Sequence, residues 1–176
     1  MKKLQLLPVG VLDARLLEWL SQALQEKFRK PAEILSPPLD PCFALHAERQ
    51  QYHSSEILAS MQRYVNSQTW RLLGVTGLDL YIPILTFVFG EAQLGGTLAV
   101  VSHHRLQQEF YGLPSDADLL AGRLLIEAVH ELGHTLHLTH CHDYRCAMAP
   151  SHAVEWIDIK NSAFCEYCLS RMLQTA

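Results

Sequence analysis

Residues 130 to 140 read HELGHTLHLTH and constrain this chain more than any other stretch. On an α-helix, side chains four residues apart lie one turn above each other, so His130 and His134 can direct both imidazoles at one metal ion, with Glu131 beside them. By chance alone this spacing arises in roughly one chain in a hundred of this size, and more often where there are many histidines. The five residues alone leave metal binding and coincidence about equally favoured.

A third histidine strengthens the metal interpretation. His140 lies six residues after His134, past the expected end of the helix, where a turning chain can bring it back as a third nitrogen ligand. Three neutral imidazoles leave the fourth position of a zinc ion for water, as in catalytic zinc sites. The opposite face of the same helix is apolar, which predicts a buried back and a polar front. That face carries Ala121, Leu125, Ala128, Leu132 and Leu136.

Four of the five cysteines lie between residues 141 and 168. Cys141 and Cys146 form a C-x4-C pair, and Cys165 and Cys168 form a C-x2-C pair. Four thiolates satisfy a closed tetrahedral zinc site, which contributes folding free energy and performs no chemistry. The alternatives are a buried cluster of reduced thiols and a redox pair at the C-x2-C, which lacks the strand-to-helix context of a thioredoxin-like site. Cys42 is expected to be a small buried hydrophobic residue.

Hydrophobic periodicity predicts a mixed α/β chain. The predicted strands cover residues 5–9, 32–35, 71–76, 85–89 and 97–102. The predicted helices follow Asp13, follow Ser54 and Ser55 as capping residues, run from Asp116 or Asp118 to about Leu138, and cover residues 161–173. Residues 39–51 show no sustained period and are expected to form a loop.

Composition excludes several classes of protein. Of 176 residues, 49% are apolar and 18% are charged, which is typical of a soluble globular domain and excludes global disorder. The net charge of −4 and the lack of a basic cluster argue against nucleic acid as a partner. The longest apolar run, residues 80–89, contains Pro83 and is too short for a membrane span. The first residues lack a signal-peptide cleavage site, so we expect a cytoplasmic protein, in which cysteines are thiols or metal ligands rather than disulfides.

The order HExxHxxxxxH, then Cys141, then Cys146-Ala147-Met148, then Cys165-x-x-Cys168 resembles the archaemetzincins, a metzincin-clan family of zinc-dependent peptidases. The match runs from residue 130 to residue 168, and the order of the elements before it also fits. The resemblance implies a metzincin-like fold: a twisted, mostly parallel five-stranded sheet with an antiparallel edge strand, an active-site helix and a C-terminal helix. Residues 1–176 would form a single peptidase domain with a four-cysteine zinc subsite at 141–168.

The resemblance also implies a role for individual residues. His130, His134 and His140 would hold a catalytic zinc ion, Glu131 would be the general base, and Met148 would form the methionine turn beneath the ligands. A second, structural zinc ion would be held by Cys141, Cys146, Cys165 and Cys168. The chain would then be a zinc metallopeptidase with two Zn²⁺ ions that acts as a monomer on peptide or protein substrates. Aminopeptidase and endopeptidase activity are both compatible with these residues. A strand at residues 85–89 is expected to border the cleft and to bind an extended peptide by strand addition.

One position departs from the family pattern, because His137 stands where the family has a glycine that lets the chain leave the helix sharply. A non-glycine residue at positive φ costs on the order of 1 kcal/mol. His130 and His137 are separated by about 10.5 Å of helix rise, so one zinc ion cannot hold both. We therefore expect the helix to end near His137. The departure favours a second hypothesis, a catalytically weak or inactive peptide-binding protein with a structural zinc, whereas the presence of Glu131 disfavours it.

Overall fold

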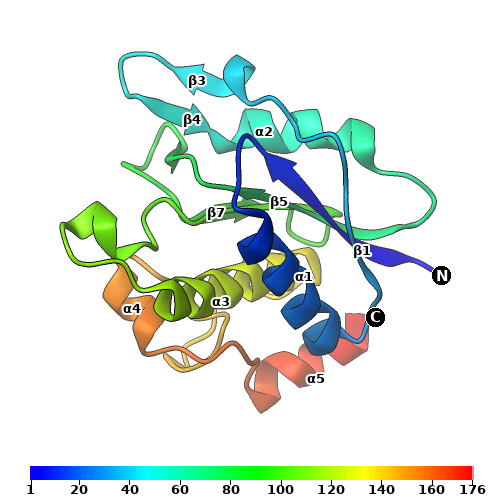
Figure 1. The fold of residues 1–176 in the computed structure, drawn as a ribbon. Helices are drawn as coiled ribbons and strands as arrows, with labels where there is room; N and C mark the ends of the chain where they lie inside the picture. Colours follow the sequence, from blue (N-terminus) through cyan, green and yellow to red (C-terminus); the bar gives the residue numbers. More distant parts are fainter. Residues whose placement is uncertain (176) are drawn as a thin grey trace.

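The computed structural model describes residues 1–175, with side chains described to residue 172. A twisted five-stranded sheet lies at the centre, in the order β2-β1-β5-β8-β7 (Figure 1). All neighbouring strands are parallel except β7, which runs antiparallel to β8 at one edge. The strands are β1 (Lys3–Val9), β2 (Ala32–Ile34), β5 (Thr69–Thr76), β7 (Gly90–Ala92) and β8 (Leu98–Ser102). The predicted fold class is confirmed.

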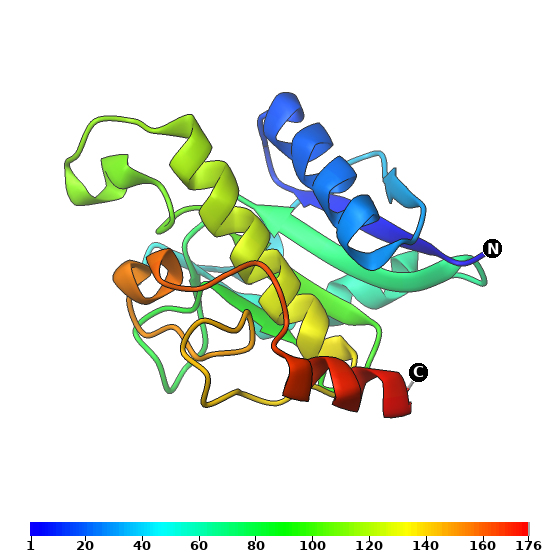
Figure 2. The ribbon, with the colours of Figure 1, turned by 90° about the horizontal axis from the view of Figure 1, so that it is seen from below.

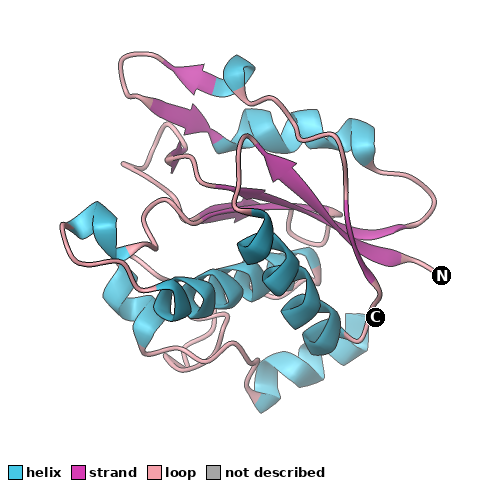
Figure 3. Ribbon diagram, viewed as in Figure 1, coloured by secondary structure: helices cyan, strands magenta, loops and turns pink. Residues whose placement is uncertain are grey.

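Helices cover both faces of this sheet (Figure 3). On one face lie α1 (Ala14–Phe28) and α3 (Ala117–Thr135), whose apolar side chains share one core cluster with β1, β5 and β8. Both helices begin as the sequence predicts, because the carboxylates of Asp13 and Asp116 accept hydrogen bonds from backbone N–H groups of the first turns. Seen from below, α3 lies between α1 and the C-terminal part of the chain (Figure 2). This places α3 over the sheet, beside the segment that carries the cysteines.

The other face is covered by α2 (Ser54–Met61), which packs on the sheet through a second core cluster. The predicted serine cap of this helix was wrong. His53 precedes the helix without a capping side-chain hydrogen bond, and Ser54 and Ser55 both donate their hydroxyl protons to the carboxylate of Glu91 on β7. The two hydroxyls therefore donate to a distant carboxylate, whereas a capping serine would accept from backbone N–H groups of its own helix.

Residues 39–51, predicted as a loop, contain short regular elements. A 3-10 helix covers Cys42–Ala44, and β3 (Leu45–His46), β4 (Gln51–His53) and β6 (Leu80–Tyr81) form a small second sheet. The prediction that Cys42 is buried was wrong, because this residue begins the 3-10 turn at the surface and is exposed.

The prediction of a strand at residues 85–89 was also wrong. This segment forms turns, and Val88 alone makes an isolated bridge to Leu80. Side chains take the place of a neighbouring strand, since Arg49 donates to the carbonyl oxygens of Leu85 and Thr86. The edge strand is β7, directly after this segment.

The C-terminal part differs from expectation in two ways. A short helix, α4 (Val154–Asp158), was not predicted, and the last helix, α5 (Glu166–Thr175), starts later than residue 161. Residues 161–165 are not helical because their backbone groups bond to the preceding loop: the N–H of Asn161 donates to Arg145, and the carbonyl of Ala163 accepts from Ala147. Within the described residues, no helix is long and apolar enough to span a bilayer.

Candidate active site

Helix α3 positions two histidines in a defined protonation state. Nδ1 of His130 lies 2.8 Å from the carbonyl oxygen of Ala147, and Nδ1 of His134 lies 2.8 Å from that of Leu138. Carbonyl oxygens only accept hydrogen bonds, so each Nδ1 carries the ring proton and each Nε2 of the neutral ring presents a lone pair. The two Nε2 atoms face each other at 3.1 Å. Two lone pairs at this distance repel unless a cation lies between or beside them.

The surroundings favour the neutral form of these rings. Burial lowers the pKa of His130 well below its usual value, and burial also lowers the pKa of His134 and His140. The positive charge of Lys160 acts in the same direction on all three. Neutral imidazole is the form that binds a metal ion.

Helix α3 ends at Thr135, five residues before the third histidine of the motif, His140. The N–H of His137 donates to the carbonyl of His134, and the N–H of Leu138 donates to that of Gly133, both at 3.1 Å. This hydrogen-bond pair is a Schellman motif, in which His137 takes the left-handed position with φ of 65°. The expected end of the helix near His137 is confirmed, and the chain turns back towards His140.

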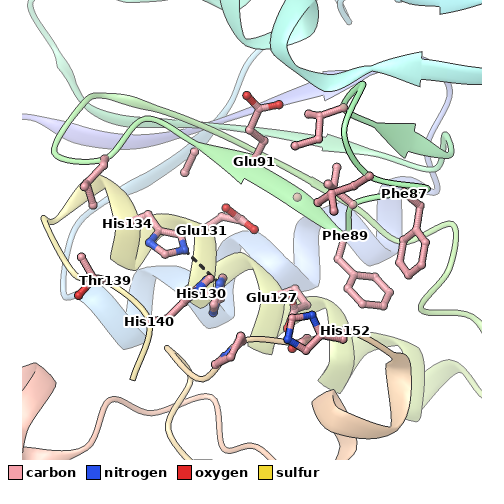
Figure 4. Close-up of a pocket in the computed structure, with 18 of the residues that line it drawn as sticks. Phe87, Phe89, Glu91, Glu127, His130, Glu131, His134, Thr139, His140 and His152 are labelled. Atoms are coloured by element: carbon pink, nitrogen blue, oxygen red, sulfur yellow. Dashed lines mark hydrogen bonds between the residues drawn. The ribbon is translucent and has the colours of Figure 1, made fainter. Parts of the chain in front are cut away.

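His140 completes a cluster of three imidazoles. One ring nitrogen from each of His130, His134 and His140 lies within 4.8 Å of the others. Figure 4 shows the three rings together on one side of the cleft, two from α3 and one from the chain after it. A zinc ion with bonds of about 2.1 Å holds tetrahedral ligands about 3.4 Å apart, so the donor set fits zinc with small adjustments.

The four C-terminal cysteines form a second cluster, with all Sγ atoms within 4.8 Å of one another. Sγ of Cys141 lies 3.7 Å from Sγ of Cys165, close to the roughly 3.8 Å between sulfurs on a tetrahedral zinc ion. Backbone N–H groups of Met148 and Cys165 point at Sγ of Cys146 at 3.4 and 3.3 Å. Such donors stabilise a thiolate, so the donor chemistry fits zinc here too.

Met148 connects the two clusters. Its side chain is fully buried, packs against Gly133 of α3 and shares a core cluster with Cys146 and Cys168. Its carbonyl oxygen accepts from the N–H of Cys141 at 2.9 Å. The methionine therefore lies beneath the helix turn that bears the histidines and beside the thiols.

Glu131 lies in the wall of a cleft, with a side chain that is largely buried. Among the described residues, none donates a hydrogen bond to its carboxylate. Burial raises the pKa of Glu131 well above its usual value, and the nearby charges of Glu127 and Glu91 act in the same direction. A carboxylate without a protein partner and with a raised proton affinity is suited to accept a proton.

The cleft has a volume of about 660 Å³ and is open to solvent. The turns of residues 82–89 and strand β7 form one wall, and α3 forms the other, so β7 presents its outer edge to the cleft (Figure 4). Gly90 allows close approach, since a Cβ atom there would lie 2.6 Å from Cγ of Glu131. The lining residues include Phe87, Phe89, Glu127, His130, Glu131, His134, Thr139, His140, Ser151 and His152.

The sequence analysis did not identify two buried charged residues in this region, Glu127 and Lys160. Nζ of Lys160 lies 3.0 Å from Oε1 of Glu127, and their side chains are 1% and 3% exposed. Glu127 could have been found, because it lies four residues before Glu131 and so on the same side of the helix. The role of Lys160 could not be predicted from the sequence, because its position beside Glu127 depends on the path of the loop that returns beneath α3.

Comparison with known proteins agrees with this geometry. The profile of peptidase family M54 matches residues 43–174. The archaemetzincin of Methanocaldococcus jannaschii is 41% identical over 166 residues, covering 94% of this chain and 89% of the relative. The crystal structure of archaemetzincin from Archaeoglobus fulgidus superposes with a TM-score of 0.83 at 37% identity, over 96% of this chain and 99% of that chain. The structure from Methanopyrus kandleri gives 0.85 at 31% identity, over 99% and 94%.

The fold, the helix with its His-Glu-His spacing and these relatives define a zinc metallopeptidase. The chain belongs to peptidase family M54, the archaemetzincins, as its motifs indicate.

Proposed function

We propose that this peptidase cleaves peptide bonds in the cleft beside Glu131, with His130, His134 and His140 as the ligands of a catalytic zinc ion. The observation that carries the proposal is the pair of Nε2 lone pairs held 3.1 Å apart next to a carboxylate that has no partner among the described residues. A zinc ion held there supplies Lewis acidity, which makes water a stronger acid near neutral pH and stabilises negative charge on the substrate carbonyl.

Glu131 is the general base of the proposed reaction. Its raised pKa makes it a better proton acceptor than an exposed glutamate, and its position in the cleft wall allows it to take a proton from the attacking water. The protonated carboxyl then donates this proton to the nitrogen of the leaving amine. Its free oxygen atoms support both steps, because no protein hydrogen bond from the described residues must first be broken.

The peptide substrate binds along the outer edge of β7. This edge strand offers unpaired backbone groups towards the cleft, so an extended peptide can add to the sheet there. The strand expected at residues 85–89 is replaced in this role by Gly90–Ala92, one step further along the chain. The rings of Phe87 and Phe89 lie in the same wall and favour apolar side chains of the substrate.

The four cysteines hold the second, structural zinc ion, which gives two zinc ions per chain. The cluster is closed by four sulfur donors, two of them buried, and this arrangement supports a structural role rather than a catalytic one. All proposed ligands and Glu131 come from residues 130–168 of one chain, which supports a single peptidase domain that acts as a monomer. Four reduced thiols also suit the reducing cytoplasm.

The second hypothesis, a binding protein without turnover, rested on His137 in place of glycine. The Schellman motif forms with His137 at its left-handed position, and the three imidazoles still converge. The departure therefore leaves the proposed catalytic arrangement intact, and the binding protein is not favoured.

Cleavage of a peptide library by the zinc-loaded protein and by Glu131→Gln tests the proposal. We expect the wild type to cleave, and Glu131→Gln to retain its zinc and its fold while kcat falls at least about 100-fold, the size of a general-base contribution. Equal cleavage by the two proteins would exclude Glu131 as the base. A wild-type protein that holds no metal at the histidines would contradict the proposed ligands.

A further inference from the structure

An ammonium group is buried between helix α3 and the segment that follows Met148. Nζ of Lys160 lies 3.0 Å from Oε1 of Glu127, donates to the carbonyl oxygen of Ala149 at 2.8 Å and lies 3.5 Å from that of Ala147. Oε1 of Glu127 also accepts from the hydroxyl of Ser151 at 3.1 Å. Removing a charge from water is unfavourable, and pairing it in the interior often gives no net gain in stability over apolar residues. The presence of Lys160 therefore calls for a reason other than stability.

The carbonyl of Ala147 links this ammonium to the metal site. Its oxygen accepts a hydrogen bond from Nδ1 of His130 at 2.8 Å and faces Nζ of Lys160 as well. The hydrogen bond on the second ring nitrogen of a metal-binding histidine sets its tautomer and ring orientation. Glu127 anchors the same ammonium on α3, one turn before His130 and Glu131.

We propose that Lys160 is a positioning residue of the active site, which holds the Ala147 carbonyl where it orients the imidazole of His130. The inference rests on the proposed role of His130 as a metal ligand. Lys160 contacts the carbonyls on both sides of Met148, at residues 147 and 149, so it fixes the methionine turn against α3. Because Glu127 neutralises its charge, the ammonium can remain in this buried position.

A second ion pair on the same helix provides a matched control. Arg123, one turn before Glu127, binds Asp158 of α4 through two hydrogen bonds of 2.7 Å and donates a third to the carbonyl of Leu106. This pair also joins α3 to the segment after the methionine turn. The guanidinium group of Arg123 donates to Asp158 and Leu106, and none of these hydrogen bonds goes to residues 147–149. If Lys160 served only to hold the segments together, the two pairs would be equivalent.

The test compares Glu127→Gln/Lys160→Met with Arg123→Met/Asp158→Asn. Each double variant removes both charges of one pair, so neither leaves a buried charge alone. With the cysteine site loaded, the zinc affinity of the histidine site is measured by chelator competition, and its geometry by the visible absorption of bound Co²⁺. We expect Glu127→Gln/Lys160→Met to bind zinc about 10- to 100-fold more weakly, with an altered cobalt spectrum and a lower kcat at unchanged KM. The control pair keeps the wild-type affinity within about threefold and the wild-type spectrum.

A folded Glu127→Gln/Lys160→Met variant with wild-type zinc affinity and cobalt spectrum would overturn the inference. If that variant does not fold, Lys160→Arg decides, because it keeps the charge but replaces the compact ammonium by a planar guanidinium group. We expect Lys160→Arg to alter the cobalt spectrum and weaken zinc binding about 3- to 10-fold, and no change in either would overturn the inference. Absence of metal at the histidine site of the wild type would contradict the proposed function itself, and the inference with it.

Discussion

The imidazole ring of His137 lies directly on Gly95, in the loop between β7 and β8. A Cβ atom at residue 95 would overlap Cε1 and Nδ1 of His137, so no other residue type fits there without moving the ring. The N–H of Gly95 also donates to the carbonyl of His134 at 2.9 Å. Both residues have positive φ, 67° for Gly95 and 65° for His137. The sheet edge and the end of α3 are therefore attached to each other where the chain turns towards His140.

His137→Gly tests whether this histidine is needed for metal binding. Glycine removes a left-handed strain of about 1 kcal/mol but also removes the ring that covers Gly95. We expect the zinc affinity of the histidine site to stay the same or to improve, whereas His140→Ala should weaken it at least about 100-fold because a proposed ligand is lost. Isothermal titration of the two variants measures this. Loss of zinc binding in His137→Gly but not in His140→Ala would show that the proposed ligand set is wrong.

Gly95→Ala should destabilise the protein by about 1–3 kcal/mol, because the methyl group meets the His137 ring and the residue keeps its positive φ. In the double variant Gly95→Ala/His137→Gly the ring is absent, so we expect part of this loss to be recovered. Urea unfolding of the two single variants and the double variant gives the coupling free energy. Strictly additive effects would mean that the two residues do not interact.

Gly90→Ala should reduce kcat while leaving both proposed metal sites filled. The added methyl group would lie 2.6 Å from Cγ of Glu131 and from the carbonyl oxygen of Val100, so the glutamate must move. A shift of about 1 Å in a catalytic group can cost on the order of 100-fold in rate. Gly122→Ala on α3 is the control, because a Cβ atom there would have no neighbouring atom within 4 Å, and it should retain full activity. Wild-type kcat in Gly90→Ala would show that Glu131 tolerates the displacement.

The two proposed metal sites should differ in how firmly they hold zinc. Four sulfur donors close one site, whereas three imidazoles leave the other open at a position that borders the cleft. We expect protein purified without chelators to contain two zinc ions per chain, and a mild chelator to remove the one at the histidines first. Elemental analysis before and after treatment measures both. One zinc ion or none in the untreated protein would contradict the expected count.

Cys165→Ser should destabilise the fold by more than about 3 kcal/mol, since it removes a ligand of the proposed structural site. Cys42→Ser is the matched control, because Cys42 is exposed and lies outside the cluster, and its melting temperature should equal that of the wild type. Glu131→Gln should also melt like the wild type. If Cys165→Ser and the wild type melt at the same temperature, the four cysteines have no structural role.

Features that depend on local spacing were predictable from the amino-acid sequence. The helical period places His130, Glu131 and His134 on one side of α3. Asp13 caps its helix as predicted, and Asp116 is the one of the two candidates, Asp116 and Asp118, that caps α3. The end of α3 near His137 was also predictable from local geometry. In each case the interacting groups lie within a few residues of one another, so the backbone geometry of a helix or turn already sets their distance.

Contacts between distant segments were not predictable in this way, because they form only when the chain has folded. Residues 85–89 border the cleft as turns rather than as a strand, and Arg49 donates to the carbonyls of Leu85 and Thr86, so the edge strand at the cleft is β7. Ser54 donates its hydroxyl proton to Glu91 instead of capping its own helix. Lys160, in a loop 33 residues further along the chain, donates to the carboxylate of Glu127. Such contacts depend on which buried polar groups remain to be satisfied after the sheet and helices have packed. No spacing along the chain encodes them, since the partners become neighbours only in the folded protein.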